Sequence, residues 1–94
     1  MKIDILAKPE EKIKMEKVSQ MLRTAALNVK VPVVVNFSNN FAAFAGKSYD
    51  PLKTPIVFIE GNAEFSGDLP SISMIQKKLL ELKEKKAQSQ SMEF

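Results

Sequence analysis

Cysteine and histidine are both absent from the 94 residues of this chain. Without cysteine there can be no disulfide bond, no thiol nucleophile and no dithiol redox chemistry, because the thiolate is the group that attacks in disulfide exchange. The chain also lacks the usual ligands of zinc and the side chain that most often serves as a general acid or base. We therefore expect no cofactor and no metal.

Long apolar runs and glycine-rich loops are missing as well. No run of apolar residues approaches the roughly 20 that a membrane-spanning helix requires, so we expect no membrane partner. Asp4 stands where a secretory signal would carry its apolar segment, and a cytoplasmic location is expected. The 3 glycines are scattered, which excludes a glycine-rich phosphate-binding loop.

The acidic residues do not form an obvious catalytic group. Glu10 and Glu11 are adjacent, so they cannot face each other on a helix, and neither has a catalytic partner in the sequence. The remaining acids in the second half of the chain are dispersed, as is typical of turns and surfaces; they include Asp50, Glu60, Glu64 and Asp68. The chain is not expected to be an enzyme.

What the chain does contain is enough apolar residues, 45%, for the small core of one domain. We place that domain at residues 1–86 and expect the polar residues 87–94 to be disordered. The net charge is +3, and much of the basic excess lies at Lys83, Lys85 and Lys86. Lysines at the end of a helix are typical of a solvated surface, so nucleic acid is not the favoured partner.

Hydrophobic periodicity predicts seven elements. We expect strands at 2–7, 31–37, 56–60 and 63–66, and helices at 9–28, 41–45 and 72–86, the last with Ser71 as its N-cap. Three consecutive valines in the second strand predict a central strand that is covered on both faces. The first helix carries an apolar stripe of Met15, Val18, Leu22, Ala25 and Val29. The last helix carries a stripe of Ile72, Ile75, Leu79 and Leu82, broadened by Met74 and Leu80.

The clearest local signal is the hairpin within residues 54–67. An apolar β-rich run ends at Gly61 and Asn62, which tolerate the positive φ of a tight turn. Pro55 lacks an N–H and suits the start of the first strand, while Gly67 follows the return strand, where a side chain would hinder a bulge or a close approach. The complete order, β-α-β-α-β-β-α, predicts an α/β domain with a mixed four-stranded sheet flanked by three helices.

This order is that of the thioredoxin fold, and residues 44–71 resemble the small glutaredoxin-like thioredoxins called redox-active disulfide protein 2. The matching features are Phe44-Ala45-Gly46, Thr54-Pro55, the strand 56–59, Glu60-Gly61, Phe65-Ser66-Gly67 and Pro70-Ser71. The resemblance implies a thioredoxin-like domain over residues 1–86 and a cis bond between Thr54 and Pro55. It also implies that the backbone before this proline pairs with extended peptides.

The sequence departs from the family in two places. The family's Cys-x-x-Cys would lie in or near residues 8–12, where this chain has Lys-Pro-Glu-Glu-Lys, so the domain is expected to be redox-inactive. Residues 47–53 look inserted before Thr54 and would lie beside the same loop. The resemblance leaves two roles open for Thr54-Pro55, a peptide-contacting loop or a rigid turn that sets strand register.

Three functions follow from these observations. The first is a binding module for an unknown protein or peptide, with a surface made of Lys8, Pro9, Glu10, Glu11, Tyr49, Thr54 and Pro55. Tyr49 would serve there as an amphipathic anchor. The second is a self-associating structural module, a homodimer that completes its core with residues such as Val33–Val35. The third is nucleic-acid binding through the lysine-rich last helix, although no stacking platform accompanies it.

Overall fold

The predicted α/β class and the mixed four-stranded sheet are confirmed. The computed structural model describes residues 1–67 and 71–91, with side chains up to residue 85. In chain order the elements are β1 (Lys2–Leu6), the 3-10 turn η1 (Pro9–Glu11), α1 (Lys12–Asn28), β2 (Val34–Ser38), the 3-10 turn η2 (Phe41–Phe44), β3 (Ile56–Ile59), β4 (Asn62–Ser66) and α2 (Ile72–Ser91). The strand order is β2-β1-β3-β4; β1 runs parallel to β2, and the other pairs are antiparallel.

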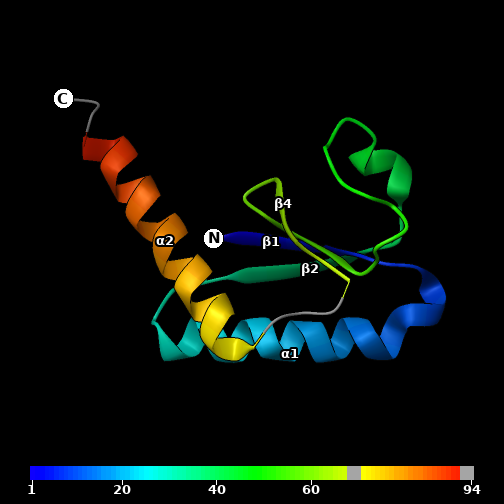
Figure 1. Ribbon diagram of the computed structural model, residues 1–94, viewed down its shortest axis with the longest axis horizontal. Helices are drawn as coiled ribbons and strands as arrows, with labels where there is room; N and C mark the ends of the chain where they lie inside the picture. The colour runs from blue at the N-terminus through cyan, green and yellow to red at the C-terminus, as the bar shows by residue number, and fades with distance from the viewer. Residues whose placement is uncertain (68–70, 92–94) are drawn as a thin grey trace.

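Each face of the sheet has its own core. Figure 1 shows α1 running beneath the strands and α2 crossing them at one end, with the η2 segment and its following loop at the opposite end. The larger core joins the sheet to the two helices and includes Ile3, Ile5, Leu22, Val57 and Leu79. The smaller core lies on the other face and consists of Leu6, Phe44, Ile56 and Phe58, with Phe41, Tyr49 and Ala63 packed against it.

The prediction of three helices is wrong, because the described residues contain two α-helices. The predicted helix at 41–45 is the 3-10 turn η2, in which Asn40 makes no side-chain cap and Phe44 is buried. A segment this short cannot offset the entropy of starting an α-helix, so a tighter turn forms instead. The predicted helix at 9–28 is present as η1 followed directly by α1.

The prediction of a central second strand is also wrong. β2 pairs with β1 alone among the described residues and lies at one edge of the sheet. Val33 and Val35 pack against the larger core, but Val34 points away from it and is 63% exposed. The three valines therefore mark a strand that is covered on one face, and the β-branched residues alone could not distinguish an edge strand from a central one.

The hairpin is present, with its turn one residue earlier than Gly61 and Asn62. Ile59 pairs with Asn62, so the turn residues are Glu60 and Gly61, with φ of 51° and 87°. Positive φ at both positions is the geometry of a type I′ turn, which suits the right-handed twist of the strands. Gly67 also has a positive φ, 69°, and its N–H lies 2.9 Å from the carbonyl of Pro55. Its conformation, rather than crowding, requires glycine there, because an added Cβ would come no closer than 3.9 Å to other atoms.

The last helix packs with the predicted stripe of Ile72, Ile75, Leu79 and Leu82 toward the larger core. The two residues thought to broaden that stripe do not belong to it, since Met74 is 60% and Leu80 42% exposed. Ser71 caps the helix by accepting a hydrogen bond from the N–H of Met74 at 3.4 Å. The backbone stays helical to Ser91. Residues 68–70, and the tail residues 92–94 that were expected to be disordered, lie outside the described residues.

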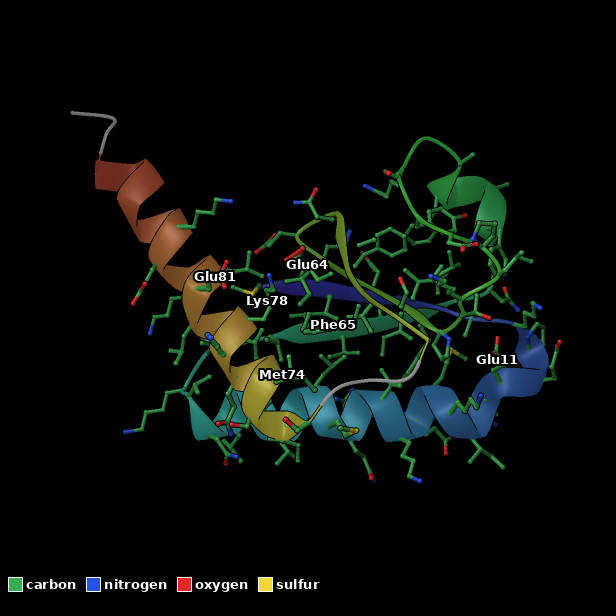
Figure 2. All side chains as sticks on the ribbon, in the orientation of Figure 1. Glu11, Glu64, Phe65, Met74, Lys78 and Glu81 are labelled. Carbon is green, nitrogen blue, oxygen red and sulfur yellow. The ribbon has the colours of Figure 1, made fainter. Side chains whose placement is uncertain are left out.

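Charged side chains join α2 to the hairpin. Lys78 lies 3.9 Å from Glu64 of β4 and 3.9 Å from Glu81 of its own helix. Figure 2 shows these three side chains together at the seam between α2 and β4. Within the part of the chain that the structure describes, neither helix is long and apolar enough to cross a membrane.

Candidate functional site

The carboxylate of Glu11 holds two distant loops together. The Thr54 hydroxyl donates a hydrogen bond of 2.7 Å to Glu11 Oε1, across 43 residues of sequence. The main-chain N–H of Lys8 donates to the same oxygen at 3.0 Å. The loop after β1 and the segment before β3 are therefore joined at one end of the sheet, beside the last residues of β1.

These contacts lower the pKa of the Glu11 carboxyl below its ordinary value of 4.5. The largest cause is the hydrogen bond from Thr54; partial burial opposes it, and the amide and charge of Lys8 reinforce it. Because the folded state favours the ionised carboxylate, this contribution to stability is present above pH 4.5 and is lost as the pH falls through the lowered pKa.

Replacing Thr54 by valine should therefore cost about 1 kcal/mol of stability at neutral pH, since it removes the donor without changing the side-chain shape. The pKa of Glu11 should also rise toward its ordinary value. A carbon-detected NMR titration of the Glu11 carboxyl would measure this shift directly. The matched control is Thr24→Val, which changes an exposed threonine of α1 and should leave the Glu11 titration as it is. An unchanged titration in Thr54→Val would contradict the assignment.

The Thr54–Pro55 bond is cis, the isomer that the resemblance implies. Pro55 is buried, so its ring is not available to a partner. Thr54 is half-buried, and no hydrogen bond within the described residues involves its main-chain N–H or C=O. The main chain of Thr54, and not the proline ring, is thus the part of this pair that could contact a peptide.

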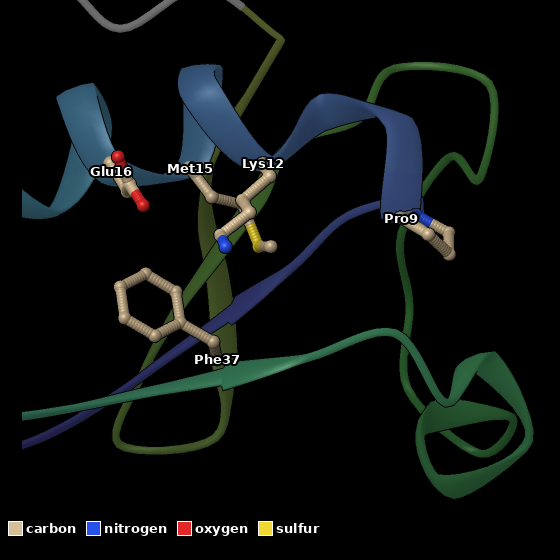
Figure 3. Close-up of a pocket in the computed structure, with 5 residues that line it drawn as sticks. All are labelled: Pro9, Lys12, Met15, Glu16 and Phe37. Atoms are coloured by element: carbon tan, nitrogen blue, oxygen red, sulfur yellow. The ribbon is translucent and has the colours of Figure 1, made fainter.

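An apolar cleft lies on the other side of the η1 loop. It has a volume of about 340 Å³ and is lined by Pro9, Lys12, Met15, Glu16 and Phe37. Figure 3 shows the Met15 thioether and the Phe37 ring facing each other across the space between α1 and β2. A second hollow, lined by Pro9, Met15, Phe37, Ser38 and Asn39, continues this cleft around the end of β2. Most of the wall is apolar, which suits a hydrophobic side chain.

The structure brings together only some of the predicted site residues. Lys8, Pro9, Glu11 and Thr54 meet at the end of the sheet, and Glu10 is exposed on the same 3-10 turn. Tyr49 is half-buried and packs edge-on against Phe58, with the ring centres 5.4 Å apart. It packs against the smaller core. Its contact with Phe58 is therefore a packing contact.

Met15 and Phe37 were not predicted as site residues. Met15 begins the apolar stripe of the first helix, and Phe37 ends the predicted second strand, so both looked like core positions. The edge position of β2 leaves Phe37 48% exposed and opens the space beside Met15. Knowing the order of the strands in the sheet would have identified Met15 and Phe37 as cleft residues, but the hydrophobic pattern of the sequence does not reveal that order. No group of three or more potential metal ligands occurs within residues 1–67 and 71–91.

Comparison of the chain with protein-family models, with curated proteins and with solved structures gave no match.

Proposed function

We propose that this chain is a redox-inactive, thioredoxin-like binding module that holds an extended peptide segment of a partner protein at the end of its sheet. The strand order β2-β1-β3-β4 and the absence of cysteine support the class. The observation that supports the function is the Glu11–Thr54 link of 2.7 Å, because it fixes, beside an apolar cleft, a loop in which the main chain of Thr54 has no hydrogen bond to the described residues.

The spacing of the two parts suits one short peptide. β2 and β3 are the two neighbours of β1, so their ends are separated by about two strand spacings, or roughly 10 Å. About three extended residues span that distance. A peptide whose backbone pairs with Thr54 can therefore reach the cleft with an apolar side chain. Such a combination of main-chain pairing and a side-chain pocket is how strand-like peptides are commonly recognised.

The role of each residue follows from its position. Glu11 positions the loop and holds Thr54, while Pro9, Met15 and Phe37 offer the apolar surface. Lys12 and Glu16 stand at the rim, where their charges would select the flanking residues of the peptide. The module needs no catalytic group, and its activity is the capture itself.

Placing a charge in the cleft should abolish capture. In Met15→Glu a carboxylate replaces the thioether, which makes burial of an apolar peptide side chain unfavourable, and we expect binding to weaken at least about 30-fold. A displayed library of random peptides would supply ligands, and titration calorimetry would measure their affinity for both proteins.

Ile13→Glu is the matched control, because Ile13 belongs to the same helix, is 81% exposed and does not line the cleft. It should bind selected peptides as tightly as the unmodified chain does. If the library yields no ligand, or if Met15→Glu and Ile13→Glu bind equally well, the proposed site is wrong. Circular dichroism of both variants would show that each retains its fold.

A further inference from the structure

The two edges of the sheet are protected to different degrees. β4 carries a bulge at Glu64, since Val57 pairs with Phe65 while Phe58 pairs with Ala63. Glu64 also places a charge on that edge and pairs with Lys78. Bulges and charges are the usual devices that stop an edge strand from pairing with another chain. β2 has neither, and the sequence has no charged residue from position 31 to position 46.

The outward main-chain groups of β2 can be assigned from its bonds to β1. The N–H of Val34 donates to the Met1 carbonyl at 3.0 Å, and the Ser38 carbonyl accepts from the Ala7 N–H at 3.1 Å. Even-numbered residues of β2 therefore face β1. By strand alternation, Val33, Val35 and Phe37 direct their N–H and C=O groups to the free edge.

We propose that a second copy of this chain pairs antiparallel along β2, so that the sheet continues across a two-fold axis. The axis passes beside Val35, which lies opposite Val35 of the partner subunit. Val33 then lies opposite Phe37 of the partner subunit, and each outward residue exchanges both main-chain hydrogen bonds with the residue it faces. The exposed ring of Phe37 packs on valine in this register.

The helices support the same register. Phe37 shares the cleft with Lys12 and Glu16, which places the end of β2 beside the first turns of α1. β1 and β2 are parallel, so the connecting helix runs antiparallel to both. Val35 lies two residues before Phe37, about 6.6 Å back along β2. Because α1 runs in the opposite direction, this distance corresponds to about four residues further along the helix. The axis therefore passes beside α1 at the level of Ser19 and Gln20.

This position of the axis pairs opposite charges. Arg23 is seven residues after Glu16, so the two lie on the same flank of α1, the flank that borders β2. With the axis between them, Glu16 lies opposite Arg23 of the partner subunit, and the symmetry makes that pair twice. Leu27 belongs to the same flank and is 78% exposed. It lies opposite the aliphatic stem of Lys12 of the partner subunit. This self-complementarity is why the occupant is a second copy.

Sedimentation equilibrium of the full chain, with no peptide present, tests the proposal. We expect a monomer–dimer equilibrium at micromolar concentrations. Glu16→Arg alone and Arg23→Glu alone should each weaken the dimer about ten-fold, because two attractive contacts become repulsive. The double variant Glu16→Arg with Arg23→Glu should recover the unmodified affinity to within about three-fold.

Val34→Lys supplies a second, independent test of the edge. Val34 is 63% exposed on the face away from the helices, so lysine fits there without disturbing the core, and it should weaken the dimer as edge lysines do. Ile13→Lys, at a position of α1 that is 81% exposed and does not line the cleft, is the control and should leave the dimer unchanged. A chain that stays monomeric, a dimer unaffected by Val34→Lys, or a double reversal no better than the single ones overturns the proposal.

These outcomes are separate from those of the peptide assay. The dimer is measured without peptide, and Arg23→Glu and Val34→Lys alter no residue that is assigned to peptide capture. A monomer that still captures peptides refutes the dimer alone, while a dimer whose monomeric Val34→Lys variant also captures none refutes the binding function alone.

Discussion

Replacing Phe58 by alanine should lower the free energy of unfolding by about 3 to 5 kcal/mol, a large fraction of the roughly 5 to 14 kcal/mol expected for a chain of this length. Phe58 is fully buried at the centre of the smaller core. Its ring stacks on Phe44 with centroids 4.8 Å apart and meets Tyr49 edge-on at 5.4 Å. The variant therefore loses transfer free energy and two aromatic contacts, and leaves a cavity.

Urea denaturation followed by circular dichroism would measure the loss. Phe41→Ala is the matched control, because Phe41 packs against the same cluster but is only partly buried. It should cost about 1 kcal/mol, a value typical of a partly exposed site. Equal effects of the two substitutions would show that residues 41–55 do not close a core over this face of the sheet.

This face also shows where sequence reasoning reached its limit. In the segment 41–45, Phe44 is buried and Phe41 partly buried, while the alanines are exposed. The secondary structure of this segment was not predictable from the apolar spacing, because two phenylalanines three residues apart fit a 3-10 turn as well as an α-helix. The four strands were predicted in the correct order along the chain. Whether β2 is covered on one face or on both depends on which strands become its neighbours in the sheet, and the sequence pattern does not show this.

The candidate site was likewise predicted in part. The resemblance implied that the two loops, residues 8–12 and Thr54-Pro55, are parts of one surface. The atom that joins them, Glu11 Oε1, could not be chosen over its neighbour Glu10 without coordinates, because the contact crosses 43 residues. The cleft was missed for a different reason. Met15 has the spacing of a core residue, and only the open edge of β2 leaves its side chain facing a void.

Peptide capture and dimerisation depend on different properties of the β2 edge. The cleft uses the side chains at the end of β2, and dimerisation uses its main chain. Phe37 takes part in both, so a partner peptide and a second copy would meet at one ring. A protein that exposes such an edge without charge or bulge commonly pairs it with another strand, and this is the physical basis of the proposed dimer.

Leu79→Ala and Leu80→Ala should differ sharply although the residues are adjacent. Leu79 is fully buried against the larger core, and its truncation should cost about 2 to 5 kcal/mol through lost burial and a cavity.

Leu80, at 42% exposed, points away from that core, and its truncation should change the free energy of unfolding by about 0.5 kcal/mol or less. Both substitutions keep a good helix former, so the helical propensity of α2 cancels in the comparison. Urea melts of the two variants at one protein concentration would give the difference, since a dimer makes stability depend on concentration. Similar losses at both positions would mean that α2 packs a broader face against the sheet, as its sequence alone suggests. A loss confined to Leu79 would show that α2 completes the larger core through the narrow stripe alone.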